Sequence, residues 1–197
     1  KLRAVEVVEE GLVRRVRGVA YACKVSPQMA NRMAGEARGV LNNLLPDVFV
    51  VTDVAKGASS GASAGYGIIL LAETTSGVLY CAEAAAKPPA PGGGAGDMTS
   101  PEELGTQCAH QLLEEISRGG CVDSSRQALG LTLCAMSSEG ASRLRLGPLT
   151  EQAVAVLRIL KDVLGVTFRL DAERATGTVM AACVGAGGIG NASVRYA

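Results

Sequence analysis

The pattern of apolar and polar residues predicts a strand and then a helix near the start of the chain. The strand is expected from Arg17, over the short apolar run RGVAYACK. A helix should follow, because Ser26 can cap it and Pro27 suits its first position. Apolar residues then recur at helical spacing until Pro46, at Met29, Met33, Val40, Leu41 and Leu44.

Three strand-like runs and a second helix complete the first block. The runs cover residues 47–54, 65–77 and 78–86, and the last two meet in a tight turn at Ser76-Gly77. The second helix starts at Ser100 with a capping box and ends at Gly119-Gly120. Its apolar stripe consists of Leu104, Cys108, Leu112 and Ile116. The order β-α-β-β-β-α predicts a four-stranded sheet with both helices on one face.

The second block, beyond Cys121, again alternates between helices and strands. Helices are predicted at about 124–138 and at 150–164, the latter with Thr150 as its cap and Gly165 as its stop. Strands are predicted over 142–146, 166–172 and 178–184. A Pro/Gly-rich loop is expected at 87–97. The chain is therefore predicted to be an α+β protein made of two units.

The composition indicates a folded protein without a strongly charged surface. Hydrophobic residues make up 48% of the 197 residues, yet no apolar run approaches the length of a membrane span. The 19 Lys and Arg residues balance the 19 Asp and Glu residues, so we expect no field that drives free nucleic-acid binding. Aromatic residues make up only 3%, which argues against a base-stacking surface. Because the chain begins at Lys1 without a leader, we expect it to be a soluble fragment of a longer protein.

Short motifs predict neither a metal site nor a nucleotide site. The six cysteines are far apart and form no C-x-x-C pair, which argues against zinc and is typical of reduced intracellular thiols. His110 is the only histidine, and we expect it to be solvated. Gly185, Gly187 and Gly190 match G-x-G-x-x-G, but the chain stops at Ala197 and leaves no room for the following helix and strand of a dinucleotide site.

Arg14, Arg15 and Arg17, with Lys24 beyond them, form the strongest local cluster of positive charge. A charged edge of a strand would explain this basic cluster without any ligand. The alternative is a contact with RNA phosphates or with an acidic protein partner. Both explanations stay open at the level of the sequence.

Four longer stretches resemble the RNA 3′-terminal phosphate cyclase family, and within it the cyclase-like branch. They are RGVAYACKVSPQMANRM, GASSGASAGYGIILLAETTSG, PEELGTQCAHQLLEEISRGGCVDS and LRLGPLT. The resemblance implies repeated α/β units with a smaller four-stranded, two-helix insert domain. Residues 17–120 would be that insert domain, 1–16 the end of a main-body segment, and 121–197 the C-terminal part of the main body, ending in a glycine-rich turn and a final strand.

The resemblance also implies that the catalytic residues of the family are missing. Cyclases form a covalent adenylate on a histidine and pass AMP to an RNA 3′-phosphate, which requires a nucleophilic nitrogen. Gln152 stands at the position of that histidine, and a glutamine amide nitrogen is not nucleophilic. Ala128-Leu129 replaces an Asp-Gln pair, although Asp123 matches the motif before it. Cyclase activity is therefore expected to be lost, and we expect no catalytic residue, metal or cofactor.

The function implied by the resemblance is that of a non-catalytic assembly factor for the small ribosomal subunit. Such a protein acts in early pre-rRNA processing within the small-subunit processome in the nucleolus, without a membrane. Its implied partners are a P-loop GTPase assembly factor, a small nucleolar RNP and the pre-rRNA. The alternative is an active ATP-dependent RNA 3′-terminal phosphate cyclase or a pre-rRNA endonuclease.

Overall fold

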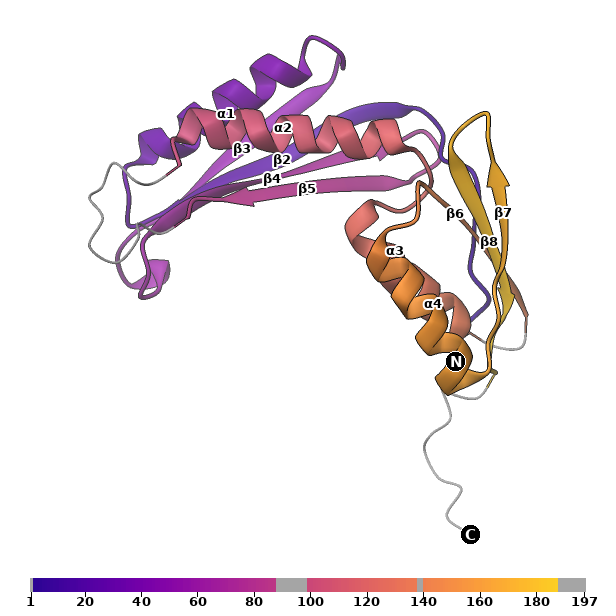
Figure 1. The fold of residues 1–197 in the computed structure, drawn as a ribbon. Coiled ribbons are helices and arrows are strands. Elements are labelled where there is room, and N and C mark those ends of the chain that lie inside the picture. Colours follow the sequence, from indigo (N-terminus) through magenta and orange to yellow (C-terminus); the bar gives the residue numbers. More distant parts are fainter. Residues whose placement is uncertain (1, 88–98, 138–139, 188–197) are drawn as a thin grey trace. The chain divides into compact units, whose positions relative to one another are not determined.

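The structure, a computed structural model, describes residues 2–87, 99–137 and 140–187, which form two compact units (Figure 1). The central unit comprises residues 12–75 and 79–117. The terminal unit combines residues 2–11 and 118–187 with 76–78. The sequence analysis places the corresponding boundaries after residues 16 and 120. Most of the expected Pro/Gly loop, residues 88–97, lies outside the described residues.

The central unit is a four-stranded sheet with two helices on one face, as the order of its elements predicts (Figure 1). The strands are β2 (Val13–Cys23), β3 (Val48–Ala55), β4 (Gly65–Thr74) and β5 (Leu79–Ala85), in the spatial order β3-β2-β4-β5. β2 is parallel to β3 and antiparallel to β4, and β4 and β5 form the predicted hairpin. β2 starts four residues earlier than expected. It is an inner strand from Val16 onward, which includes Arg17, whereas its first residues, with Arg14 and Arg15, pair with β4 alone.

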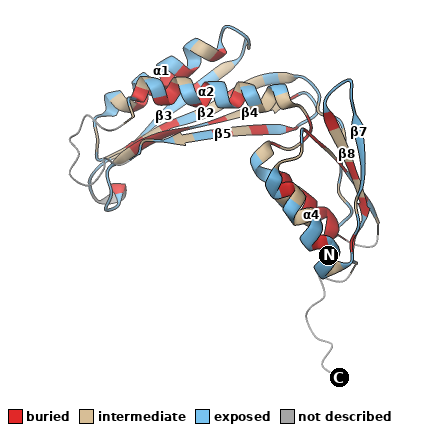
Figure 2. Cartoon of the chain, viewed as in Figure 1, coloured by how far each residue is buried: buried red, intermediate tan, exposed pale blue. Residues whose placement is uncertain are grey.

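The helices of the central unit, α1 (Pro27–Leu41) and α2 (Pro101–Arg118), begin at the predicted caps. The Ser26 hydroxyl accepts a hydrogen bond from the backbone N–H of Gln28 (3.4 Å), and the Ser100 hydroxyl accepts one from Glu103 (3.2 Å). Both helices bury an apolar stripe (Figure 2). The buried residues of the sheet include Val16, Ala20, Ile68 and Leu70. Leu44, expected on the stripe of α1, lies beyond the end of that helix and is exposed.

The terminal unit is a second four-stranded sheet that packs against two helices. Its strands are β1 (Glu6–Val7), β6 (Ala141–Leu146), β7 (Arg169–Glu173) and β8 (Thr178–Val184), in the order β1-β6-β8-β7. Its helices are α3 (Gln127–Ala135) and α4 (Glu151–Leu164). The core between the layers includes Leu131, Cys134, Leu144, Leu146, Leu160 and Ala181. The α+β fold class is confirmed for both units.

Two details of the terminal unit differ from the sequence pattern. The helix expected over about 124–138 is split, because a 3-10 turn (Ser124–Arg126) precedes α3. β1 pairs in parallel with β6, and the pattern does not reveal it because it has only two residues. The limits of α4 agree with the prediction: Thr150 caps it, and Gly165 ends it with φ 67°, in the left-handed region that favours glycine.

The glycine-rich stretch after β8 begins with a close packing contact. A Cβ atom at Gly185 would collide with the backbone of Ser137. The backbone N–H groups of Ala186 and Gly187 donate to the carbonyl oxygens of Ala135 (2.9 Å) and Ser137 (3.1 Å). Packing against the end of α3 therefore explains the glycine at 185. Gly190 and the expected final strand lie outside the described residues.

The described residues contain no helix long and apolar enough to cross a bilayer. All six cysteines are described, and each is a free thiol. Four of them, Cys108, Cys121, Cys134 and Cys183, are buried. They therefore act as small core residues of the two units.

Candidate functional site

The first turns of α3 and α4 are joined by one buried side chain, that of Gln127. This residue opens α3 and is 1% exposed. Its amide nitrogen donates to the carbonyl oxygen of Pro148 (3.0 Å), and its amide oxygen accepts from the backbone N–H of Thr150 (3.0 Å). One amide thus satisfies two backbone groups immediately before α4 and holds the starts of the two helices side by side.

The positions that the resemblance aligns with cyclase residues lie within two residues of this link. Ala128 is half-buried and Leu129 is 57% exposed, both in the first turn of α3. Gln152 is exposed in the first turn of α4. The structure therefore brings the two helix starts together, although β6 separates them in the sequence. The Ala and Leu side chains carry no polar atom and the Gln amide is no nucleophile, so these three side chains cannot form an adenylate.

Asp123, the residue that matches the cyclase motif, caps the turn that leads into α3. Its side chain is 3% exposed. Its Oδ1 accepts hydrogen bonds from the Ser125 hydroxyl (2.8 Å) and the Arg126 backbone N–H (3.1 Å), while its Oδ2 pairs with the Arg126 guanidinium (2.6 Å). Since both carboxylate oxygens are engaged within the next three residues, Asp123 has a local structural role.

The remaining candidates for nucleophiles and metal ligands do not form a site within the described residues. No group of three His, Cys, Asp or Glu side chains there is arranged to hold a metal ion. His110 is exposed on α2, in the central unit, whereas Gln152 belongs to the terminal unit. Burial raises the pKa of the Cys108 thiol to about 12 and that of Cys121 to about 11, so both stay protonated near neutral pH.

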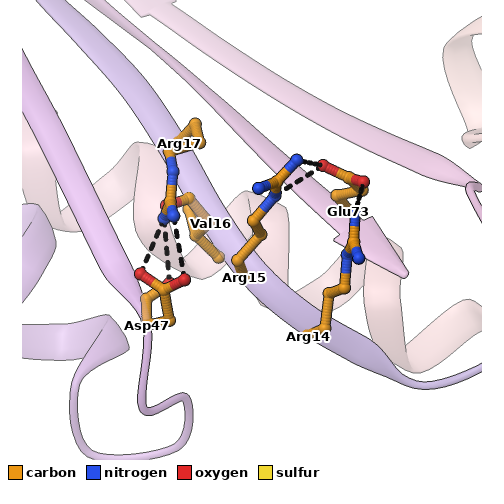
Figure 3. Close-up of polar contacts among 6 residues, drawn as sticks. All are labelled: Arg14, Arg15, Val16, Arg17, Asp47 and Glu73. Atoms are coloured by element: carbon orange, nitrogen blue, oxygen red, sulfur yellow. Dashed lines mark hydrogen bonds and ion pairs between the residues drawn. The ribbon is translucent and has the colours of Figure 1, made fainter. Parts of the chain in front are cut away.

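The three arginines of the basic cluster are held by two carboxylates (Figure 3). Glu73 on β4 pairs with Arg14 and also accepts from Arg15 Nε (2.6 Å). Asp47, just before β3, accepts from Nη1 and Nη2 of Arg17, each at 2.8 Å. Hydrogen bonds from Arg14 and Arg15 lower the pKa of Glu73, and the one from Arg17 lowers the pKa of Asp47. Ion pairs within the central unit therefore compensate much of the charge of the cluster.

The arginines nevertheless remain accessible, since 40 to 50% of their side-chain surface is exposed. A phosphate or an acidic partner would compete with Glu73 and Asp47 for these guanidinium groups. Lys24, which has φ 52°, directs its ammonium group at the carbonyl oxygen of Ala62 (3.3 Å). The contact of Arg14, Arg15, Arg17 and Lys24 with RNA or a partner stays a prediction.

A groove between α4 and β7, which the sequence analysis does not anticipate, is the second cationic feature. Its volume is about 240 Å³. The lining is mainly apolar and includes Leu149, Leu157, Phe168 and Leu170. Two cations, Arg158 and Lys161, also line it, and neither has an ion pair or a side-chain hydrogen bond within the described part of the chain. We call this feature the α4–β7 groove.

The α4–β7 groove has the chemistry of a protein-binding surface. Apolar walls with unpaired cations suit a segment that combines apolar and acidic side chains. β7 pairs only with β8 and is the edge of the described sheet, so an extended peptide could add to its outer side. The sequence reveals the groove only in part: Arg158 and Lys161 are one helical turn apart, which places both cations on one side of α4. Leu149 and Phe168 come from either side of α4, and only the folded chain brings them together.

Comparison with known proteins gives consistent matches. The model of the RNA 3′-terminal phosphate cyclase (RTC) insert domain matches residues 8–117, a range that spans the central unit. An RNA 3′-terminal phosphate cyclase-like protein of Homo sapiens is 42% identical over 192 residues, covering 94% of this chain and 50% of that protein. A probable RNA 3′-terminal phosphate cyclase-like protein of Drosophila melanogaster is 42% identical over 198 residues, covering 94% and 51%. The rRNA processing protein rcl1 of Schizosaccharomyces pombe is 42% identical over 188 residues, covering 94% and 49%.

The chain spans about half the length of the curated relatives it matches. The insert-domain match covers more than half of the chain itself, and it coincides with a four-stranded, two-helix unit of the kind that the family resemblance implies. The chain therefore belongs to the RNA 3′-terminal phosphate cyclase family, in its cyclase-like branch.

Proposed function

We propose that this chain is part of a non-catalytic factor that acts in rRNA processing during assembly of the small ribosomal subunit. The observation that carries the proposal is Gln152, which stands at the start of α4 where the resemblance aligns the histidine that cyclases adenylate. Without a nucleophilic nitrogen at that position, the phosphoramidate intermediate cannot form there. The relative from Schizosaccharomyces pombe, named an rRNA processing protein, supports a role in that process.

We further propose that the protein acts in the nucleolus, within the small-subunit processome, by binding other proteins. As the resemblance implies, its partners would be a P-loop GTPase assembly factor and a small nucleolar RNP with its pre-rRNA. The α4–β7 groove supports a protein contact, because it offers apolar surface together with Arg158 and Lys161, cations that have no ion pair within the described residues. A balanced net charge fits docking through a protein interface rather than through a phosphate backbone.

The basic cluster would supply a secondary contact. RNA phosphates could reach Arg14, Arg15, Arg17 and Lys24, but the three arginines would first have to leave Glu73 and Asp47. That competition reduces the gain from each new ion pair. We therefore expect the groove to contribute more to association than the basic cluster.

The experiment that tests this function is affinity purification of the tagged full-length protein from nuclear extract. The bound proteins and RNAs are identified, and an extract that expresses the tag alone is the control. The expected result is recovery of a P-loop GTPase together with small-subunit precursor RNA and its guide RNP. Recovery of the protein without these partners would contradict the proposal.

The alternative activity has a direct test of its own. The full-length protein is incubated with labelled ATP and magnesium, beside an active cyclase as the positive control. We expect no AMP to remain bound to the denatured protein. Stable protein-bound AMP would overturn the non-catalytic assignment, and its persistence in a Gln152→Ala variant would show that another residue is the nucleophile.

A further inference from the structure

Within the described residues of the central unit, one face of the sheet, here called the open face, is not covered by a helix and carries exposed apolar side chains. α1 and α2 cover one face, where Val16, Ala20 and Leu70 are buried. Side chains alternate between the two faces along each strand, so the residues next to these buried ones point to the opposite face. Pairing between neighbouring strands aligns these side chains in rows. Val19 lies between Val51 on β3 and Ile69 on β4, and Arg17 lies between Phe49 and Leu71. Among these, Phe49 is 58% exposed, Val51 and Ile69 are 41% exposed, and Val19 is 38% exposed.

Two hollows on this open face share Ile69. The first, of about 410 Å³, is lined by Arg17, Gly18, Val19, Phe49, Val51, Ile69 and Leu71. The second, also about 410 Å³, is lined by Tyr21, Ile69, Glu83, Ala84 and Ala85. A Cβ atom at residue 67 would collide with the Tyr21 hydroxyl, so the glycine there lets the Tyr21 ring lie against the sheet. The face therefore offers an apolar hollow beside one that contains a carboxylate.

Two carboxylates of the open face have no partner within the described residues, whereas two of its arginines are bound by carboxylates. Arg17 is bound by Asp47, and Arg15 is bound by Glu73. Glu83, opposite Ile69, and Asp53, opposite Tyr21, have no ion pair or side-chain hydrogen bond within the described residues. RNA phosphates would meet these carboxylates, whereas a lysine or arginine of a protein would pair with them. Charge complementarity therefore favours a basic protein segment over RNA.

We propose that the open face of the central sheet docks a basic, amphipathic helix of a partner protein. Apolar side chains of that helix would fill the hollow around Phe49 and Leu71, and its Lys or Arg side chains would pair with Glu83 and Asp53. A helix on this face would complete a helix–sheet–helix sandwich and remove the exposed apolar residues from water. This surface belongs to the central unit and the α4–β7 groove to the terminal unit, so the proposal does not depend on the groove, although the hollow shares Arg17 with the basic cluster.

The test selects random peptides, displayed on phage, against the full chain and measures the affinity of enriched peptides by fluorescence anisotropy. The expected peptides carry Lys or Arg beside apolar residues at helical spacing. Ile69→Ala and Glu83→Lys should each weaken their binding by about tenfold or more, because each removes a central contact. The matched controls are Leu44→Ala, an exposed apolar residue that lines neither hollow, and Glu36→Lys on the exposed side of α1. Neither control should change the affinity.

A second selection on Glu83→Lys gives an independent readout, because it should favour acidic over basic peptides. Both substituted residues are solvent-accessible, so the variants should melt close to the wild type, which circular dichroism checks. Failure to enrich peptides, or enriched peptides that both variants bind as tightly as the wild type, would overturn the proposal. Binding of labelled single-stranded RNA that is lost in Ile69→Ala would assign the face to RNA instead. A dimer in sedimentation that Ile69→Ala dissociates would assign it to a second copy of the chain.

Discussion

At the residue scale, the buried polar side chain of Gln127 connects the starts of α3 and α4. A buried amide is stabilising only when its hydrogen bonds are satisfied, and Gln127 meets this condition through Pro148 and Thr150. The same two bonds place the first turn of α3 beside that of α4. The position of Gln152 relative to Ala128 therefore depends on a neighbouring residue, not on the aligned residues themselves.

Replacement of Gln127 should destabilise the terminal unit. Gln127→Met keeps the length of the side chain but leaves the Thr150 N–H and the Pro148 carbonyl without their partner. We expect a loss of about 1–3 kcal/mol in the free energy of unfolding, measured by urea denaturation. Gln111→Met, at an exposed position of α2, is the control and should change stability little. Equal stability of the two variants would mean that the link contributes nothing.

The ion pair of Glu73 predicts a specific dependence of stability on pH. Hydrogen bonds from Arg14 and Arg15 hold the pKa of Glu73 below its ordinary value of 4.5. A carboxylate with a lowered pKa stabilises the fold above its ordinary pKa, and this contribution disappears as pH falls through the folded-state pKa. The Tm of Glu73→Gln should therefore lie below that of the wild type near neutral pH, and the difference should shrink below pH 4.5.

Calorimetry over a pH series measures this difference, which should be small because the pair is accessible to solvent. The control is Glu36→Gln on α1, whose carboxylate has no ion pair within the described residues. Its Tm difference from the wild type should stay constant across the series. A constant difference for Glu73→Gln as well would show that its ion pairs do not stabilise the fold.

At the scale of elements, a glycine sets how closely α1 and α2 approach. A Cβ atom at Gly105 of α2 would collide with the carbonyl oxygen of Met33 on α1, which belongs to the backbone and cannot rotate away. The glycines of α1 differ, because a Cβ atom at Gly35 would meet nothing within 4 Å. The two helices therefore need glycine at one position and only tolerate it at the other.

Alanine substitutions at these two glycines should have opposite effects on stability. Gly105→Ala forces the helices apart and should cost about 1–3 kcal/mol. Gly35→Ala reduces the entropy of the unfolded chain at an exposed helical position and should stabilise by about 0.5–1 kcal/mol. Chemical denaturation of both variants measures the difference. Destabilisation by Gly35→Ala of the same size as by Gly105→Ala would rule out the close helix contact as the cause.

Local signals predicted most helix limits but not every strand. Side-chain caps and stop residues act within one helical turn, so Ser26, Ser100, Thr150 and Gly165 could be recognised without the fold. β1 could not, because two residues carry no periodicity and its pairing with β6 joins distant parts of the chain. The start of β2 was misplaced because Arg14 and Arg15 are polar, although their ion pairs with Glu73 allow them within the sheet.

At the scale of the whole molecule, the α4–β7 groove predicts how charge reversal affects association. Arg158→Glu combined with Lys161→Glu should reduce recovery of the partner protein in the affinity purification by on the order of tenfold. Thermal stability should change little, because neither cation has a carboxylate partner within the described residues. Arg174→Glu, at an exposed residue of the turn between β7 and β8, is the control. The same recovery from both variants would exclude the groove as the binding surface.

The sequence by itself determined the α+β class, the four-stranded sheet with two helices, and the family resemblance that places Gln152 at the position of the nucleophile. These features follow from periodicity, caps and residue identity, which are local. Only the tertiary structure decided that carboxylates hold the basic cluster, that Gln127 joins α3 to α4, and that Arg158 and Lys161 line the α4–β7 groove together with apolar residues. Each of these depends on residues far apart in the chain, because hydrogen bonds, ion pairs and apolar contacts act across space after folding has brought the strands and helices together.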